Sequence, residues 1–152
     1  MDIKISKANH NESIPMDLLL LADPSEEMVS KYRNSGESYV AKAGETLIGG
    51  FILVPVSDSE IEIKNIAVYS EHQKQGVGKE LIKYAIRTAK MEAYEHIILK
   101  TADTSKYQIK LYTKLKFELE STIKGHYVKY YKEPIIEDGQ EAIDQLIFKR
   151  KL

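Results

Sequence analysis

The chain has 152 residues, a length that accommodates one domain with one sizeable core. Its hydrophobic share of 43% and charged share of 30% are typical of a soluble globular protein and argue against intrinsic disorder. No apolar run approaches the ~18 residues of a membrane span, and the start of the sequence lacks the features of a targeting signal. The absence of cysteine excludes disulfides, cysteine-ligated metals and a thiol nucleophile. We therefore expect a cytoplasmic protein with a single domain over residues 1–152.

The net charge of −1 conceals an uneven distribution of charge along the chain. Residues 1–72 carry 12 acidic and 6 basic side chains (net −6), residues 73–132 carry 6 acidic and 13 basic (net +7), and residues 133–152 carry 5 acidic and 3 basic (net −2). The lysines of the basic stretch are dispersed, which is a weak pattern for a nucleic-acid-binding module, and we expect neither a nucleic-acid nor a membrane partner. Two interpretations remain: the basic stretch serves an anionic small ligand, or it provides solvated helix surfaces.

The first half of the sequence predicts a short strand, two helices and three antiparallel strands. Alternating isoleucines are typical of the first strand, and serine, aspartate and proline signals precede each helix. Three runs of strand-forming residues then follow one another across tight turns. We expect these elements, in order, at residues 3–6, 13–21, 23–34, 38–42, 46–56 and 60–68.

The second half predicts an amphipathic helix at 78–90, a buried strand at 96–101 and a helix at 105–115. Ser105 has the spacing of a capping box, in which its hydroxyl accepts a hydrogen bond from an amide of the first turn. Two last strands are expected at residues 117–131 and 143–149, joined across a turn that includes Asp138 and Gly139.

The order of these elements predicts the fold class. A strand, a helix and a strand between residues 60 and 101 imply a parallel pair of strands with a right-handed crossover. The other strands follow one another through short connections, which favours antiparallel pairing. We therefore expect an α/β (α+β) fold with a mixed, mostly antiparallel sheet, a parallel central pair and flanking helices.

The strand at 60–68 changes its apolar period near its middle. Isoleucines occupy odd positions up to residue 63, whereas apolar residues occupy even positions from residue 66 onward. Because side chains alternate strictly along a strand, this phase shift predicts a β-bulge near Lys64 and Asn65. Either these two residues lie at an exposed edge without consequence, or the backbone groups freed after the bulge, at 66–68, bind a ligand.

A glycine-containing segment, Gln73-Lys-Gln-Gly-Val-Gly-Lys79, lies between that strand and the amphipathic helix. Glycines let the backbone approach a ligand closely and the helix N-terminus adds partial positive charge, so a diphosphate fits this position. The segment is not a P-loop, because Lys79 is followed by Glu80, nor a dinucleotide fingerprint, because Leu81 occupies the place of the third glycine. From the glycines alone, a plain tight turn is an equally open interpretation.

Together these segments resemble the GNAT superfamily of acetyl-CoA-dependent N-acetyltransferases. The pattern Gln73-x-x-Gly76-x-Gly78 matches the pyrophosphate-binding pattern of that family. The segment Leu111-Tyr-Thr-Lys-Leu-Lys-Phe117 is similar to its Leu-Tyr-x-Lys-x-Gly-Phe segment, and the element order fits over about residues 3–149. The resemblance implies acetyl-CoA as cosubstrate and transfer of its acetyl group to a primary amine of a small molecule or peptide.

The resemblance also implies roles for individual residues. Tyr112 matches a tyrosine that protonates the departing thiolate, and Glu62 matches a glutamate that serves as general base, directly or through water. Segment 66–68 matches the backbone that pairs with the pantetheine arm, and segment 74–79 matches the amides that hold the pyrophosphate. The implied cofactor-binding residues are Ile66, Ala67, Val68, Gln73, Lys74, Gln75, Gly76, Val77, Gly78, Lys79 and Ser105.

Two positions depart from the family pattern. Ser105 stands where many members have an asparagine that contacts the cofactor, so its own contact would be shorter or water-mediated. Lys116 replaces the glycine before Phe117, which predicts a different turn after that helix. The histidines lack the spacing of metal ligands, so no metal site is expected.

Several alternatives remain open at this level. Tyr112 also fits a core tyrosine, and Glu62 also fits a solvated carboxylate. The chain could be a non-catalytic acyl-CoA-binding regulatory protein rather than an enzyme. The segment 127–139 either shapes the acceptor pocket or forms a contact between two copies of the chain, a homodimer. Acidic residues of the expected acceptor wall suit a cationic acceptor or simply complement helix dipoles: Asp23, Glu26, Glu27, Glu133, Glu137 and Asp138.

Overall fold

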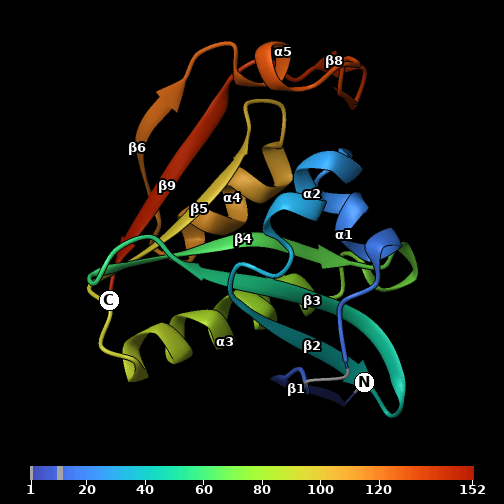
Figure 1. The fold of residues 1–152 in the computed structure, drawn as a ribbon, viewed down its shortest axis with the longest axis vertical. Coiled ribbons are helices and arrows are strands. Elements are labelled where there is room, and N and C mark those ends of the chain that lie inside the picture. The colour runs from blue at the N-terminus through green and yellow to red at the C-terminus, as the bar shows by residue number, and fades with distance from the viewer. Residues whose placement is uncertain (1, 10–11) are drawn as a thin grey trace.

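The structure is a computed structural model that describes residues 2–9 and 12–152. Met1, His10 and Asn11 lie within the expected domain range but outside the described residues. Across the described chain, a seven-stranded sheet has the order β1-β2-β3-β4-β5-β9-β6, and β7 and β8 form a separate short hairpin (Figure 1). The strands are β1 (Ile3–Lys7), β2 (Glu37–Ala43), β3 (Thr46–Pro55), β4 (Glu60–Val68), β5 (His96–Ala102), β6 (Glu118–Ile123), β7 (Ile136–Glu137), β8 (Gln140–Glu141) and β9 (Gln145–Lys151). The helices are α1 (Met16–Ala22), α2 (Glu26–Tyr32), the 3₁₀ helix η1 (Ser70–His72), α3 (Val77–Met91), α4 (Lys106–Lys114) and α5 (His126–Tyr130).

The parallel pair of strands lies near the middle of the sheet. β4 and β5 pair in parallel, with Glu60 opposite His96 and Ile63 opposite Leu99, whereas the other neighbouring strands are antiparallel. Beyond Ile63 the two strands separate, while β5 stays paired with β9 along its whole length. Figure 1 shows β5, β9 and β6 diverging from β4. The predicted mixed sheet with a parallel central pair is confirmed.

A β-bulge in β4 lies where the sequence predicts it. Ile52 of β3 is opposite Asn65, and the next residue, Leu53, is opposite Ile63, so Lys64 is the extra residue. An extra residue reverses the direction of the following side chains relative to the sheet. The bulge therefore explains the change of apolar period along this strand.

Two apolar cores cover the two faces of the sheet. The larger core packs α3 and α4 against one face, and the buried stripe of α3 is the one its sequence predicts. The smaller core packs α1 and α2 against the other face (Figure 1). Because of the bulge, Ile66 and Val68 join the larger core on the side of Ile61 and Ile63, while Ala67 turns to the smaller core. Among the described helices, none combines the length and apolar character needed to cross a membrane.

The C-terminal part differs from the prediction of one strand over 117–131. β6 ends at Ile123, and a short helix, α5, and the β7–β8 hairpin follow it. Gly125 has a φ of 67° and its amide is bound by a distant carboxylate, so the chain turns there into α5. β9 then runs between β5 and β6. The predicted turn at Asp138 and Gly139 is confirmed, since both have positive φ angles and join β7 to β8.

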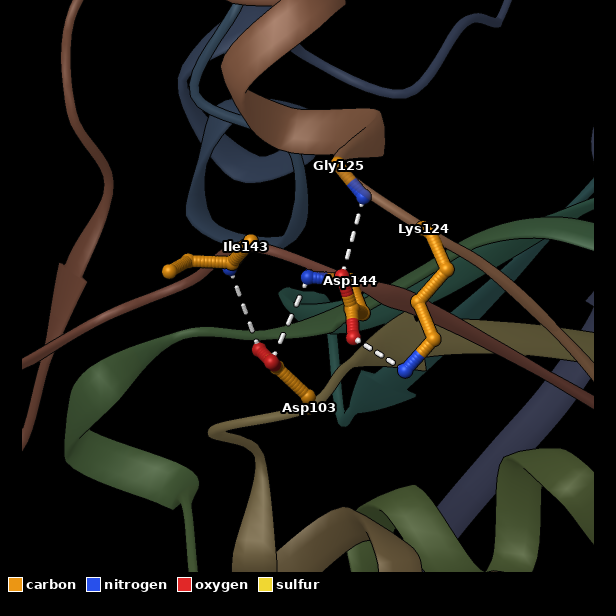
Figure 2. Close-up of polar contacts among 5 residues, drawn as sticks. All are labelled: Asp103, Lys124, Gly125, Ile143 and Asp144. Atoms are coloured by element: carbon orange, nitrogen blue, oxygen red, sulfur yellow. Dashed lines mark hydrogen bonds and ion pairs between the residues drawn. The ribbon is translucent and has the colours of Figure 1, made fainter.

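Two carboxylates anchor this C-terminal segment to the end of β5 (Figure 2). Asp103 accepts hydrogen bonds from the amides of Ile143 and Asp144, both at 3.2 Å. Asp144 accepts from the Gly125 amide at 2.9 Å and pairs with the Lys124 Nζ at 3.4 Å. The Gly125 amide and then the Lys124 ammonium hold the pKa of Asp144 below its ordinary value. These hydrogen bonds and this ion pair hold the start of α5 near the end of β5.

The large core makes a testable prediction at Phe51 of β3, which is fully buried and stacks on Tyr39 with ring centroids 4.8 Å apart. Truncation to Phe51→Ala removes this contact and leaves a cavity, so the free energy of unfolding should fall by about 3–5 kcal/mol. Urea denaturation followed by circular dichroism measures the change. Met91→Ala at an exposed position is the control, with an expected change below about 0.5 kcal/mol. Equal destabilisation of the two variants would contradict this description of the core.

Candidate active site

The candidate site begins where β4 leaves β5. The Tyr69 amide, just after β4, donates to the Ile48 carbonyl, so the backbone groups of alternate residues in β4 face β3. By this alternation, the amides and carbonyls of Ile66 and Val68 face the edge that β5 has left. Within the described residues, no strand pairs with that edge after Ile63. A bound molecule with an extended amide chain can therefore pair with it.

The glycine-containing segment leads from this edge into α3. Gln73 donates a hydrogen bond from Nε2 to the Val68 carbonyl at 2.8 Å, which ties the segment to the end of β4. Lys74 has a φ of 61° and Gly76 a φ of 88°, so the chain reverses twice before the helix begins at Val77. The segment is thus held in one conformation by left-handed residues and by a side-chain hydrogen bond.

The start of α3 offers donors and open space. The first amide of this region that bonds within the helix is that of Glu80, which donates to the Gly76 carbonyl. The preceding amides, at 77–79, are the unpaired donors of a helix N-terminus. A Cβ built at Gly76 or at Gly78 would meet no heavy atom within 4 Å. The backbone is open here, and a diphosphate fits these donors.

Glu62 is buried on the face of β4 opposite the larger core, with 6% of its surface exposed. Its Oε1 lies 3.4 Å from the Nζ of Lys100 and its Oε2 lies 3.9 Å from the Nζ of Lys64. The alternative that Glu62 is a solvated strand carboxylate is therefore wrong. Glu62 is thus a buried carboxylate that reaches two cations near the point where the strand edge becomes unpaired.

Tyr112 of α4 is 4% exposed and packs against Phe117 and Phe148, with ring centroids 6.2 and 5.9 Å away. Burial raises the pKa of its phenol above the ordinary value, and Tyr127 and Glu137 of the C-terminal segment add to the rise. Tyr112 is therefore both a core residue and a phenol that keeps its proton.

Ser105 does not form the predicted cap. It precedes α4, but its hydroxyl donates to Glu137 Oε1 at 2.8 Å, and the neighbouring Thr104 hydroxyl donates to the same oxygen at 3.0 Å. The side chain of Ser105 is directed toward Glu137, and within the described helix α4 no amide donates to its oxygen. The contact of Ser105 with the cofactor stays a prediction.

Sequence reasoning missed a polar network on the side of α1 and α2. Asp23 accepts from the hydroxyl of Tyr32 at 2.9 Å and from that of Tyr131 at 2.8 Å. Asn65, turned to this side by the bulge, donates from Nδ2 to the Tyr32 oxygen at 2.9 Å and to the Leu19 carbonyl at 3.1 Å. The network joins α2, β4 and the end of α5. The phase shift at the bulge could have predicted that Asn65 lies on this face of the sheet. No local sequence pattern predicts that the two tyrosine hydroxyls bind Asp23.

One acceptor atom of this network stays free. The Asn65 Oδ1 is buried. Among the described residues, it is the one buried side-chain nitrogen or oxygen atom without a hydrogen-bond partner. A buried unpaired oxygen costs about 1–3 kcal/mol, which a bound molecule can offset. Over residues 2–9 and 12–152, no group of three or more histidine and acidic side chains is arranged to hold a metal ion.

The fold and this geometry define a class of protein. A bulged strand that diverges from its parallel neighbour exposes backbone groups to an extended amide chain, and a helix N-terminus beside it exposes donors to a diphosphate. A buried carboxylate and a protonated phenol lie on elements that flank this edge. These features define an acyltransferase that uses an acyl-coenzyme A.

Comparisons with known proteins agree with this class. The family model described as "Acetyltransferase (GNAT) family" matches residues 9–117. The chain is 38% identical over 130 residues to the uncharacterized N-acetyltransferase YvbK of Bacillus subtilis, covering 86% of this chain and 84% of the relative.

Two solved structures are similar over nearly the whole chain. A GNAT family acetyltransferase from Elizabethkingia anophelis, with acetyl-CoA bound, has a TM-score of 0.95 at 39% identity and covers 99% of this chain and 98% of its own. A Bacillus subtilis acetyltransferase in complex with CoA has a TM-score of 0.91 at 34% identity and covers 99% of each chain. The chain belongs to the GNAT family of acetyltransferases. The predicted acetyl-CoA-dependent N-acetyltransferase class and the predicted cosubstrate are confirmed.

The open space at Gly78 makes the diphosphate site testable. A side chain in Gly78→Val would project into the space above the helix amides, so the affinity for acetyl-CoA should fall about tenfold or more through lost charge-assisted hydrogen bonds. The melting temperature should not fall, because the added Cβ meets no neighbour and glycine is a poor helix former. Calorimetric titration with acetyl-CoA measures the affinity.

The matched control is Gly78→Ala, because it adds only a methyl group at the same open position. Its affinity for acetyl-CoA should stay within about twofold of the parent, since a methyl group leaves the backbone amides accessible. If the valine variant binds acetyl-CoA as tightly as the alanine variant, the diphosphate lies elsewhere.

Proposed function

We propose that this enzyme transfers the acetyl group directly from acetyl-CoA to a primary amine of a small molecule or peptide, without an acyl-enzyme intermediate. The observation that carries the proposal is the buried Glu62 carboxylate beside the strand edge freed by the bulge. The chain has no cysteine to act as a thiol nucleophile, which also favours direct attack by the amine. The cysteine-free sequence also supports a cytoplasmic location, which we include in the proposal.

The backbone holds the cosubstrate in this proposal. The amides of 74–79 bind the pyrophosphate at the start of α3, and the free edge of Ile66 and Val68 pairs with the pantetheine arm. The hydrogen bond from Gln73 to the Val68 carbonyl keeps these two parts of the site in register. Bound acetyl-CoA supplies an activated thioester carbonyl, and the protein orients it.

Three groups then carry the proton and charge changes. Glu62, directly or through a water molecule, accepts a proton from the acceptor ammonium, whose ordinary pKa of about 10.4 keeps it protonated at neutral pH. The Val68 amide donates to the carbonyl oxygen as negative charge develops on it. As the C–N bond forms and the C–S bond breaks, Tyr112 donates its proton to the departing sulfur, and the second proton that the nitrogen loses restores the Tyr112 phenol.

Tyr112 can be tested by removing only its hydroxyl. Tyr112→Phe keeps the ring that packs in the core but takes away the proton donor, so kcat should fall about 100-fold. The pKa of Tyr112 is raised, so the phenol stays protonated and the loss should be the same at about pH 6 and about pH 9. Thiol release measures kcat, and the affinity for acetyl-CoA should stay within about twofold. Undiminished turnover would assign the general acid to another group.

Glu62 can be tested through the pH dependence of the reaction. Glu62→Gln keeps the shape of the side chain but cannot accept the proton, so kcat/KM near neutral pH should fall about 100-fold. The loss should shrink at higher pH, because a larger fraction of the amine is already deprotonated. Glu60→Gln is the matched control, since Glu60 lies two residues earlier on the same strand and pairs with Lys149 instead. If both variants lose activity equally, Glu62 has no special role.

A non-catalytic acyl-CoA-binding regulator is the second candidate, and the same two variants address it. Such a protein would bind acetyl-CoA tightly, and any slow thiol release would be the same in the parent, Tyr112→Phe and Glu62→Gln.

A further inference from the structure

We infer that the acceptor is an amino carboxylate, a molecule with a carboxylate close to the amine that receives the acetyl group. The inference rests on the proposed function and adds the class of acceptor to it. It is carried by three charged side chains, Lys64, Glu62 and Lys100, which we call the charged triad.

The fold brings the charged triad together at the point where β4 and β5 separate. Glu62 is opposite Ile98 in the parallel register, and Lys100 lies two residues after Ile98, so both charged side chains share one face of the sheet. Lys64 is the extra residue of the bulge, and its ammonium lies 3.9 Å from Glu62 on that same face. The bulge that frees the strand edge thus also supplies a cation beside it.

The charged triad has one more cation than anion. Among the ion pairs of the described residues, Lys64 and Lys100 each have Glu62 as their carboxylate partner and no other. Each ammonium offers three donors, so one shared carboxylate leaves donors unused. Their side chains are 35% and 29% exposed, so the excess positive charge is partly shielded from water and favours an anionic partner.

Three of the six acidic residues expected to attract a cationic acceptor have partners within the protein. Asp23 accepts hydrogen bonds from two tyrosine hydroxyls, and Glu137 accepts them from Ser105 and Thr104. Glu27 pairs with two lysines, Lys31 and Lys132. These contacts hold the three carboxylates in place within the protein, and the charged triad is the group of charges that lies where β4 and β5 separate.

Aromatic side chains border the charged triad. The Lys64 ammonium lies 5.5 Å from the centre of the Tyr32 ring. His126 of α5 contacts the rings of Tyr127 and Tyr131, with centroids 4.9 and 6.2 Å away. Burial and then the charges of Lys100 and Lys64 lower the pKa of the His126 imidazole, while Asp23 acts in the opposite direction. The aromatic ring beside Lys64 favours an acceptor with an apolar or aromatic body.

The two charges of an amino carboxylate complement the charged triad. The acceptor carboxylate pairs with the ammonium groups of Lys64 and Lys100, and the acceptor ammonium lies against Glu62. In this arrangement the substrate relieves Glu62 of part of its pairing with the lysines. The carboxylate of Glu62 then takes one proton from the ammonium, and the nitrogen forms the C–N bond with the thioester carbonyl. As the C–S bond breaks, Tyr112 protonates the sulfur, and the second proton that the nitrogen loses restores the Tyr112 phenol.

The test compares acceptors that differ only in the carboxylate. Thiol release is measured with the standard free amino acids, and for those acetylated also with the corresponding amide and decarboxylated amine. The free amino acid should have a kcat/KM about tenfold or more above both analogues, because the charged hydrogen bonds to the lysines are lost with the carboxylate. Amides or decarboxylated amines that react as well as the free amino acids would overturn the inference.

Variants separate recognition of the carboxylate from structural damage. Lys64→Met and Lys100→Met should each lower kcat/KM for the free amino acid about tenfold while changing that for the decarboxylated amine about twofold or less. Lys90→Met, at an exposed position of α3, is the control and should change neither value. An equal loss with both acceptors would mean that the lysines only support Glu62, and the inference would fail.

Binding measurements distinguish the failure of the inference from the failure of the proposed function. The protein loaded with CoA is titrated with free amino acids in a calorimeter, where no acetyl group is present. Binding that disappears in Lys100→Met supports the amino carboxylate class even if turnover is absent, in which case only the proposed function fails. Thiol release from simple amines without any binding or turnover of amino acids would keep the proposed function and overturn the inference.

Discussion

One extra residue in β4, Lys64, determines the geometry on which the rest of the site depends. A regular strand must pair its backbone groups along both edges when it lies inside a sheet, and β4 does so with β5 only as far as Ile63 within the described residues. After the bulge, β4 keeps its pairing with β3 and gives up its pairing with β5. The backbone groups on this edge are available to an amide-containing ligand, which can supply the partners that β5 does not. The binding edge is thus the part of β4 where the hydrogen bonding of the sheet to β5 stops.

The bulge also determines which face of the sheet each side chain of β4 occupies. Before it, Glu62 lies near Lys64 and Lys100 on the face opposite the larger core, and its neighbours pack against α3. After it, Ile66 returns to the core beside α3 while Asn65 turns toward α2. Both apolar cores therefore hold the same strand from opposite faces, on either side of the irregularity. Such support is what a precise backbone geometry needs, because a bulge in a loosely packed strand could shift its register. The same packing that stabilises the fold therefore also fixes the geometry of the site.

The features that the sequence predicted correctly depend on neighbours along the chain. The phase shift at residue 64, the apolar stripe of α3 and the turn at Asp138 are each visible within about ten residues. The features that it did not predict depend on contacts between distant segments. β6 ends early because Gly125 gives its amide to Asp144, nineteen positions later, and Ser105 turns from its cap toward Glu137, thirty-two positions later. No periodicity or capping pattern contains information about such partners, so the strand was predicted too long and the cap was wrong.

The distribution of charge along the sequence illustrates the same limit. The division into an acidic stretch, 1–72, and a basic stretch, 73–132, suggests two half-sites of opposite sign. In the folded chain, however, Lys64 from the acidic stretch and Lys100 from the basic stretch meet at Glu62, while Asp23 is satisfied by tyrosine hydroxyls. The charge that a ligand meets depends on which side chains the fold brings together at the site, because Coulomb interactions weaken with distance. The preference of this site for an acceptor therefore follows from three side chains brought together by a bulge, and the net charge of the segments around them has little bearing on it.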